Sequence, residues 1–140
     1  MRSQTNDLLL SVEDLRVHFH GDGPVALAVD GIDFCVHRRE TVCVVGESGC
    51  GKTVTALATM GLLRQPPAHI AGGRIVFDGT SLLEMESSQL RGLRGKRMAM
   101  VFQEPMTSLN PVFTIGNQIA EAIMAHEPIA ERQALDRAVQ

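Results

Sequence analysis

The sequence predicts an α/β fold, and three features of the chain support this prediction. Residues 41–45 (T-V-C-V-V) form an unbroken run rich in β-branched side chains, which is typical of a strand buried on both faces of a parallel sheet. A glycine-rich loop, residues 46–53, follows this run directly. Residues 54–63 then carry apolar side chains at helical spacing, so we expect the order strand, loop, helix.

The composition is that of an ordinary globular protein. The 140 residues are 44% hydrophobic and 21% charged, which excludes a disordered, collagen-like or disulfide-rich chain. No stretch reaches the roughly 18 uncharged apolar residues of a membrane span, so we expect no transmembrane segment. A net charge of −3 disfavours nucleic acid as a partner. Three cysteines without metal-type pairing and a polar N-terminus favour a cytoplasmic compartment.

The segment before the loop predicts a small antiparallel β-layer. Leu8–Phe19 is rich in strand-forming residues and has a polar break at Glu13 and Asp14. Residues 21–24 (G-D-G-P) signal a turn. Residues 25–36 are again extended, with apolar side chains at alternate positions, so the two strands are expected to form a hairpin.

Several shorter elements are expected after the loop. Pro66 and Pro67 end the helix that follows it. Residues 74–77 read as a strand, and residues 88–93 as a short helix for which Ser87 is a suitable N-cap.

The last third of the chain begins with another strand-like run. Residues 98–102 (M-A-M-V-F) predict a core strand, and residues 103–111 predict a loop rich in Pro, Asn and Ser. Thr114 is expected to cap a helix that reaches about His126, and residues 130–140 begin another helix. One apolar stripe on the first of these helices contains Ile115, Ile119 and Ile123.

The glycine-rich loop has the residue types that bind a nucleotide phosphate. Its sequence matches G-x-x-x-x-G-K-[ST], in which glycines let backbone N–H groups point inward and the following helix N-terminus attracts anions. The cation of Lys52 would bridge the β- and γ-phosphates, and the hydroxyl of Thr53 would ligate Mg²⁺. A glycine-rich turn that happens to precede a lysine is the alternative. The motif alone leaves kinases, GTPases, motor ATPases and transporter ATPases open. The candidate nucleotide-binding residues are Gly46, Glu47, Ser48, Gly49, Cys50, Gly51, Lys52 and Thr53.

A second candidate site residue, Gln103, ends the strand-like run 98–102. Ligand groups of open α/β sheets lie at the carboxyl ends of the strands. The side-chain amide oxygen of Gln103 can therefore ligate Mg²⁺ or orient a water. Taken on these residues alone, a solvent-exposed glutamine in a surface turn is the favoured interpretation.

Residues 98–111 (M-A-M-V-F-Q-E-P-M-T-S-L-N-P) carry a resemblance to a known family. Together with the glycine-rich loop, this string resembles the ATP-binding subunits of ABC transporters, and most closely the branch that serves dipeptide, oligopeptide, glutathione and nickel importers. The resemblance covers the chain from about Leu8 to its end. It implies a P-loop NTPase with a RecA-like core, an antiparallel β-subdomain and the start of a helical subdomain, in a truncated chain.

The resemblance implies boundaries and residue roles. Residues 1–7 would be a flexible N-terminus. Residues 8–113 would form the N-terminal part of the ATP-binding domain, and residues 114–140 the incomplete helical subdomain. Lys52 and Gln103 would be catalytic, with Gln103 contacting Mg²⁺ and the attacking water. Phe19 matches an aromatic residue that stacks on adenine in the family, and its alternative role is in the core of the β-layer.

The family also implies cofactors, partners and a location. ATP and Mg²⁺ would be bound, and ATP hydrolysis would drive the import of peptides or related solutes. The partners would be transmembrane permease subunits and a second ATP-binding subunit, in a homodimer or a heterodimer, at the cytoplasmic face of the inner membrane. Nucleic acid would not be a partner.

The sequence also lacks parts of the family's pattern. It contains no L-S-G-G-Q signature, no apolar strand ending in Asp-Glu and no later switch histidine. Phosphoryl transfer depends on several such parts, so we expect these 140 residues to bind nucleotide weakly or not at all and to be inactive alone. The alternatives are an ATPase of another ABC branch, a truncated non-catalytic P-loop binding module and a P-loop kinase.

Overall fold

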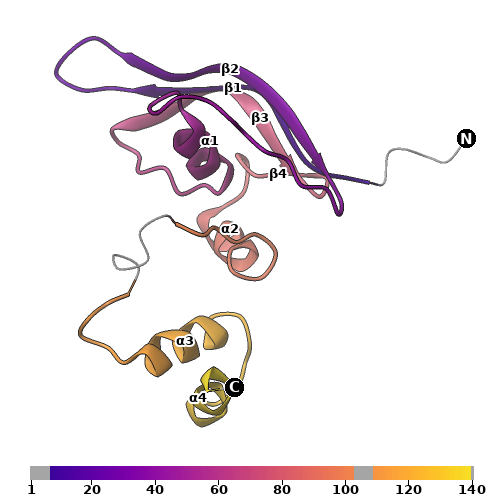
Figure 1. The fold of residues 1–140 in the computed structure, drawn as a ribbon, viewed down its shortest axis with the longest axis vertical. Helices are drawn as coiled ribbons and strands as arrows, with labels where there is room; N and C mark the ends of the chain where they lie inside the picture. The colour runs from indigo at the N-terminus through magenta and orange to yellow at the C-terminus, as the bar shows by residue number, and fades with distance from the viewer. Residues whose placement is uncertain (1–6, 103–108, 140) are drawn as a thin grey trace, which may run out of the picture. The chain divides into compact units, whose positions relative to one another are not determined.

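The computed structural model describes residues 7–102 and 109–139. The chain divides into two compact units, Met1–Leu90 and Arg91–Gln140, each of which is described by itself. The first unit contains an antiparallel sheet and one helix, and the second is built from short helices (Figure 1). The proposed boundary between residues 113 and 114 stays a prediction.

The sheet of the first unit has four antiparallel strands in the order β2-β1-β3-β4. In chain order, the strands are β1 Leu8–Phe19, β2 Ala26–His37, β3 Ala68–Phe77 and β4 Thr80–Ser81. The predicted hairpin is confirmed, and the strand expected at residues 74–77 is longer than predicted. The helix α1 (Lys52–Thr59) of this unit lies against β1 and β2 (Figure 1).

A β-bulge at the polar break keeps the core side chains of β1 on one face. Val12 and Leu15 are both buried, although three residues apart they would point to opposite faces of a regular strand. Asp14 is the extra residue: the register shifts there against β2 and β3, its φ is +44°, and its N–H donates to Asp33 Oδ1 at 2.9 Å. The bulge therefore lets Val12, Leu15 and Val17 share the buried face.

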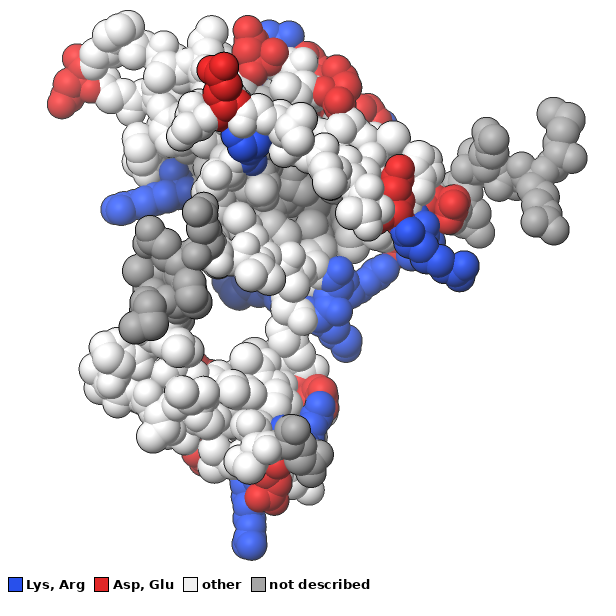
Figure 2. All heavy atoms as spheres, viewed as in Figure 1, with Lys and Arg blue, Asp and Glu red and all other residues white. Residues whose placement is uncertain are grey.

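Acidic side chains gather over β1 and the edge strand β2 (Figure 2). Asp14, Asp30 and Asp33 are exposed there, and Arg16 donates hydrogen bonds to Asp14 and Asp30. Charge on an edge strand discourages pairing with the strand of another chain. This edge is therefore suited to remain in solvent.

Two predicted strands are wrong. Residues 41–45 form no strand, and Val44 and Val45 are 59% and 88% exposed. Residues 98–102 form no strand either, apart from one isolated bridge between Met98 and Arg94. A central strand of a parallel sheet needs hydrogen-bonding neighbours on both edges, and no strand of the described sheet pairs with either segment.

The second unit is organised by two helices that pack together, α3 (Ile115–Met124) and α4 (Glu131–Ala138). A shorter helix, α2 (Ser87–Leu93), spans the boundary between the units. The predicted cap of α3 is confirmed, because the Thr114 hydroxyl accepts from the N–H of Asn117 at 3.2 Å.

The predicted stripe on α3 is not its buried face. Ile115 and Ile119 are 61% and 41% exposed, whereas Ala120 is buried on α3 and Ala134 on α4. Small side chains on both helices let the backbones approach closely, so the contact forms there. An ion pair adds a polar link, since Arg137 of α4 donates two hydrogen bonds to the carboxylate of Glu127.

The bulge gives a stability test at neighbouring glycines. Gly73 has a φ of +98°, and a methyl group on it would lie 2.5 Å from the carbonyl oxygen of Asp14, whereas one on Gly72 would meet only Arg16 Cδ, at 3.5 Å. We expect Gly73→Ala to lower the free energy of unfolding by more than about 1 kcal/mol and Gly72→Ala to change it by less. Urea unfolding followed by circular dichroism would measure both, and equal losses would contradict this account of the bulge.

The ion pair gives a pH test. The hydrogen bond and the charge of Arg137 hold the pKa of Glu127 below its usual value, with a further contribution from Lys96. A lowered folded-state pKa stabilises the fold above the unfolded value, about 4.3, and this contribution is lost as the pH falls through the folded value. We expect Arg137→Gln to raise the pKa of Glu127 and Arg132→Gln, on the same helix, to leave it unchanged. An NMR titration of the side-chain carboxyl would measure this, and no rise in Arg137→Gln would refute it.

Candidate phosphate-binding site

The phosphate loop, residues 46–53, joins the extended segment 41–45 to the start of α1. Gly51 is the N-cap of the helix, with a φ of +92°, and provides no side-chain cap. The first N–H groups of a helix have no partner within it and attract an anion together with the helix dipole. The loop therefore ends on donors that suit a phosphate.

The sheet holds the loop in place at Gly51. A methyl group on this glycine would lie 2.4 Å from the carbonyl oxygen of Ala28 in β2 and 3.5 Å from Cγ2 of Val29. Only a residue without a side chain permits such an approach, and its positive φ also favours glycine. Sequence reasoning missed this contact, because nothing in the motif indicates which strand lies beneath it.

The side chain of Lys52 points back into the phosphate loop. Its Nζ donates to the carbonyl oxygens of Gly46, at 2.7 Å, and Glu47, at 2.6 Å, and lies 3.4 Å from Cys50 Sγ. These three partners are neutral atoms, so the ammonium group has no anionic partner among them. A phosphate oxygen would offer a stronger, charge-assisted hydrogen bond. A phosphate in the loop could therefore replace the carbonyl oxygens as the partner of the lysine.

The remaining predicted loop residues lie in the same short segment. Thr53 is the second residue of α1, and its side chain is exposed. The backbone N–H of Cys50 donates to the carbonyl oxygen of Glu47 at 3.3 Å, which closes the turn through Ser48 and Gly49. Of the predicted residues, the structure therefore brings Gly46, Glu47 and Cys50 around the ammonium group of Lys52.

Phe19 is the last residue of β1 and is half-buried. Its strand neighbours are Ala26 on β2 and Ala68 on β3. Because alanine side chains are small, these two neighbours leave part of the Phe19 ring uncovered. This placement is compatible with stacking on a base and with a role in the β-layer, so the function of Phe19 stays a prediction.

The predicted magnesium ligands are Thr53 and Gln103. Gln103 lies outside the described residues, so its predicted roles in catalysis and Mg²⁺ binding stay predictions, as does the role of Thr53. Across residues 7–102 and 109–139, no three His, Cys, Asp or Glu side chains gather as a metal site. Magnesium, however, takes few protein ligands and keeps several waters.

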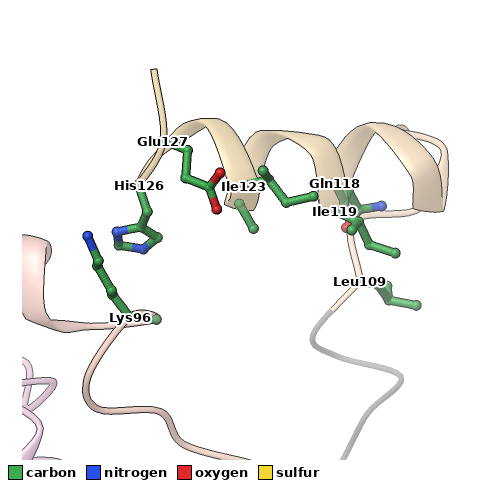
Figure 3. Close-up of a pocket in the computed structure, with 9 residues that line it drawn as sticks. Lys96, Leu109, Gln118, Ile119, Ile123, His126 and Glu127 are labelled. Atoms are coloured by element: carbon green, nitrogen blue, oxygen red, sulfur yellow. The ribbon is translucent and has the colours of Figure 1, made fainter. Parts of the chain in front are cut away.

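The second unit has a hollow of its own, of about 710 Å³ (Figure 3). Ile119 and Ile123 of α3 form its apolar wall, and Lys96 and His126 lie at one end, where the ammonium group of Lys96 points toward the imidazole (Figure 3). Gly95 permits this close packing, because a methyl group on it would lie 2.6 Å from Nε2 of His126. Glu127 lies at the same end, so this hollow combines an apolar surface with a polar end that carries both a cation and a carboxylate.

Comparison with known proteins shows to which family the chain belongs. Residues 29–140 match the profile of the ABC transporter family. The chain belongs to the ABC transporter family. This confirms the resemblance carried by the phosphate loop and the string at residues 98–111.

The curated relatives of the chain are ATP-binding proteins of transporters. The probable peptide ABC transporter ATP-binding protein y4tR of Sinorhizobium fredii is 48% identical, over all of this chain and 43% of its own length. The oligopeptide transport ATP-binding protein OppD of Bacillus subtilis is 42% identical, over 94% and 37%. The glutathione import ATP-binding protein GsiA of Salmonella typhimurium is 44% identical, over 93% and 22%. The chain thus spans about two fifths, or less, of the relatives it matches.

A solved structure supports the fold class. The ATP-binding cassette MJ0796, solved as a dimer in a post-hydrolysis state with ADP and Pi, matches with a TM-score of 0.76 over 94% of this chain and 54% of that one. The sequence identity is 16%, so the likeness concerns the fold. It confirms the α/β ATP-binding fold expected from the sequence. Within the described part of the chain, no helix is long and apolar enough to cross a membrane.

The close contact beneath the phosphate loop can be tested with two glycines. Gly49 and Gly51 both have a positive φ, but a methyl group on Gly49 would meet nothing within 4 Å. Backbone strain is therefore common to both alanine variants, and only Gly51→Ala also collides with β2. We expect Gly51→Ala to weaken binding of tripolyphosphate at least about tenfold more than Gly49→Ala does. NMR shift titrations would measure both affinities, and equal losses would remove the proposed role of Ala28.

Proposed function

We propose that the phosphate loop binds the phosphates of ATP with Mg²⁺, and that the protein is the ATP-binding subunit of a transporter that imports peptides or related small solutes. The observation that carries the first part is the position of Lys52, whose ammonium group lies inside the loop against the Gly46 and Glu47 carbonyl oxygens. The ATP-binding names of the relatives support the same conclusion.

Different residues would bind different parts of the nucleotide and its metal ion. Lys52 would leave the two carbonyl oxygens for the β- and γ-phosphates, and the N–H groups at the start of α1 would hold the same anion. Thr53 and Gln103 would ligate Mg²⁺, which when bound neutralises phosphate charge. Phe19 would stack on the adenine ring.

We further propose that catalysis needs groups that these 140 residues do not contain. Lys52 and Gln103 would take part in phosphoryl transfer, but the sequence has no L-S-G-G-Q segment and no apolar strand ending in Asp-Glu. Positioning and charge neutralisation by several groups supply nearly all of the rate in such reactions. The chain alone would therefore bind ATP weakly and not turn it over.

The proposed partners follow from the relatives. Their names assign them to peptide, oligopeptide and glutathione transport. By analogy, this protein would act with transmembrane permease subunits and a second ATP-binding subunit, at the cytoplasmic face of the inner membrane. An ATPase of another ABC branch and a non-catalytic P-loop module are the alternatives. ATP turnover by the assembled transporter would exclude the module, and the solute that it takes up would identify the branch.

A comparison of two ligands tests the binding roles. Lys52→Ala removes a cation that would contact phosphates, so we expect it to weaken both ATP and tripolyphosphate. Phe19→Ala removes a ring that would contact only the base, worth about 1–3 kcal/mol. We expect it to weaken ATP about 5- to 150-fold and to leave tripolyphosphate unchanged. Phe19→Tyr keeps an aromatic ring and serves as the control.

NMR shift titrations with Mg²⁺ present would measure these affinities. Unchanged ATP affinity in Lys52→Ala would overturn the phosphate-binding proposal. Equal losses of ATP and tripolyphosphate in Phe19→Ala would assign Phe19 to the β-layer core instead.

A further inference from the structure

The side chain of Gln118 joins α3 to the loop that precedes it. Its Oε1 accepts from the backbone N–H of Asn110 at 3.0 Å. Its Nε2 donates to the carbonyl oxygens of Asn110, at 2.9 Å, and Phe113, at 3.0 Å. Both N–H donors of the amide and one lone pair of its oxygen are therefore used, which is most of what a glutamine can offer.

The loop at residues 110–113 is otherwise held by bonds of its own. Asn110 Oδ1 accepts from the N–H of Val112 at 3.0 Å, and the carbonyl oxygen of Asn110 accepts from the N–H of Phe113 at 3.2 Å. Both bonds are internal to the loop, and Val112 and Phe113 are 82% and 57% exposed. The three hydrogen bonds of Gln118 therefore tie the loop to the helix.

The position of Gln118 relates the loop to the hollow of the second unit. Its neighbour Ile119 lines the wall of that hollow, and Gln118 itself lies beside Leu109 at its edge (Figure 3). The helix begins immediately after the loop, at the Thr114 cap. Loop, cap and the first turns of α3 thus form one continuous hydrogen-bonded segment.

We propose that Gln118 is a positioning residue that makes the 110–113 loop and α3 move as one body. A displacement of the loop is then passed to the helix instead of being absorbed by local rearrangement, because hydrogen-bond networks between rigid elements carry energetic coupling. The proposal rests on the proposed transport function and adds to it that the 110–113 loop and α3 would together transmit ATP turnover to the transmembrane subunits. Gln118 is not among the residues assigned to nucleotide binding or catalysis.

The three hydrogen bonds of Gln118 to the loop, which together form the Gln118 clamp, can be tested in the full chain by amide hydrogen exchange. Gln118→Met keeps a side chain of similar length but makes no hydrogen bonds. We expect exchange at Asn110 and Phe113 to accelerate about 2- to 12-fold, the effect of losing one typical hydrogen bond. Gln118→Glu keeps an acceptor for the N–H of Asn110 but turns a carboxylate toward two carbonyl oxygens, so exchange at Phe113 should be at least as fast as in the methionine variant.

Gln133→Glu is the matched control for charge. Gln133 is exposed on the neighbouring helix α4, and exchange at residues 110–113 should not change in this variant. Unchanged exchange in both Gln118 variants would overturn the clamp. Equal acceleration in all three variants would also overturn it, because the effect would then come from added charge or general instability.

The consequence for transport needs the protein assembled with its transmembrane subunits in vesicles, with a labelled dipeptide as the probe. We expect Gln118→Met to leave ATP turnover near the wild-type rate and to lower dipeptide uptake per ATP about 2- to 30-fold, the range of typical coupling energies. Equal losses of turnover and uptake would show a merely structural role and overturn the proposal. If the wild-type assembly hydrolyses no ATP or takes up no dipeptide, the transport function or its solute is wrong, and the exchange experiment still decides the clamp.

Discussion

The approach of Gly51 to the Ala28 carbonyl oxygen is the contact on which the phosphate loop depends. It fixes the start of α1 on β2. The direction of the helix N-terminus, and the part of the loop that the Lys52 side chain contacts, follow from this. The strand beneath is placed in turn by its pairing with β1. The β-bulge at Asp14 is what lets β1 keep its apolar side chains on one face, so a local irregularity in the sheet supports the geometry of the site.

Electrostatics explain why the loop suits an anion in a protein of net charge −3. Asp14 and Asp30, two exposed acidic side chains of the sheet, form ion pairs with Arg16. The partners of Lys52, by contrast, are two carbonyl oxygens and a thiol. Exposed charges are screened over about 8–10 Å in physiological salt, so a net charge of −3 does not by itself exclude an anion at the loop.

Local sequence signals predicted the elements that depend on near neighbours. The hairpin, the turn at residues 21–24 and the Thr114 cap each rest on residues a few positions apart. The two failed strands, residues 41–45 and 98–102, show the opposite case. A β-branched run indicates that a segment can be buried in a sheet, but a strand also needs partner strands. None of the described strands pairs with either segment. The string around Gln103 identified the family, although Gln103 itself lies outside the described residues.

The contacts that sequence reasoning missed share a physical cause. Gln118 reaches back to Asn110, Gly51 meets Ala28, and Ala120 is buried on α3 whereas Ile115 and Ile119 are exposed. In each case the residue type is compatible with many environments, and only the folded backbone brings its partner within reach. A polar side chain eight residues from its partner has no periodic signature, whereas a phosphate loop has a strict one because its ligand imposes the spacing. The phosphate-binding motif could therefore be found in the sequence, whereas the contacts of Gln118, Gly51 and Ala120 required the structure.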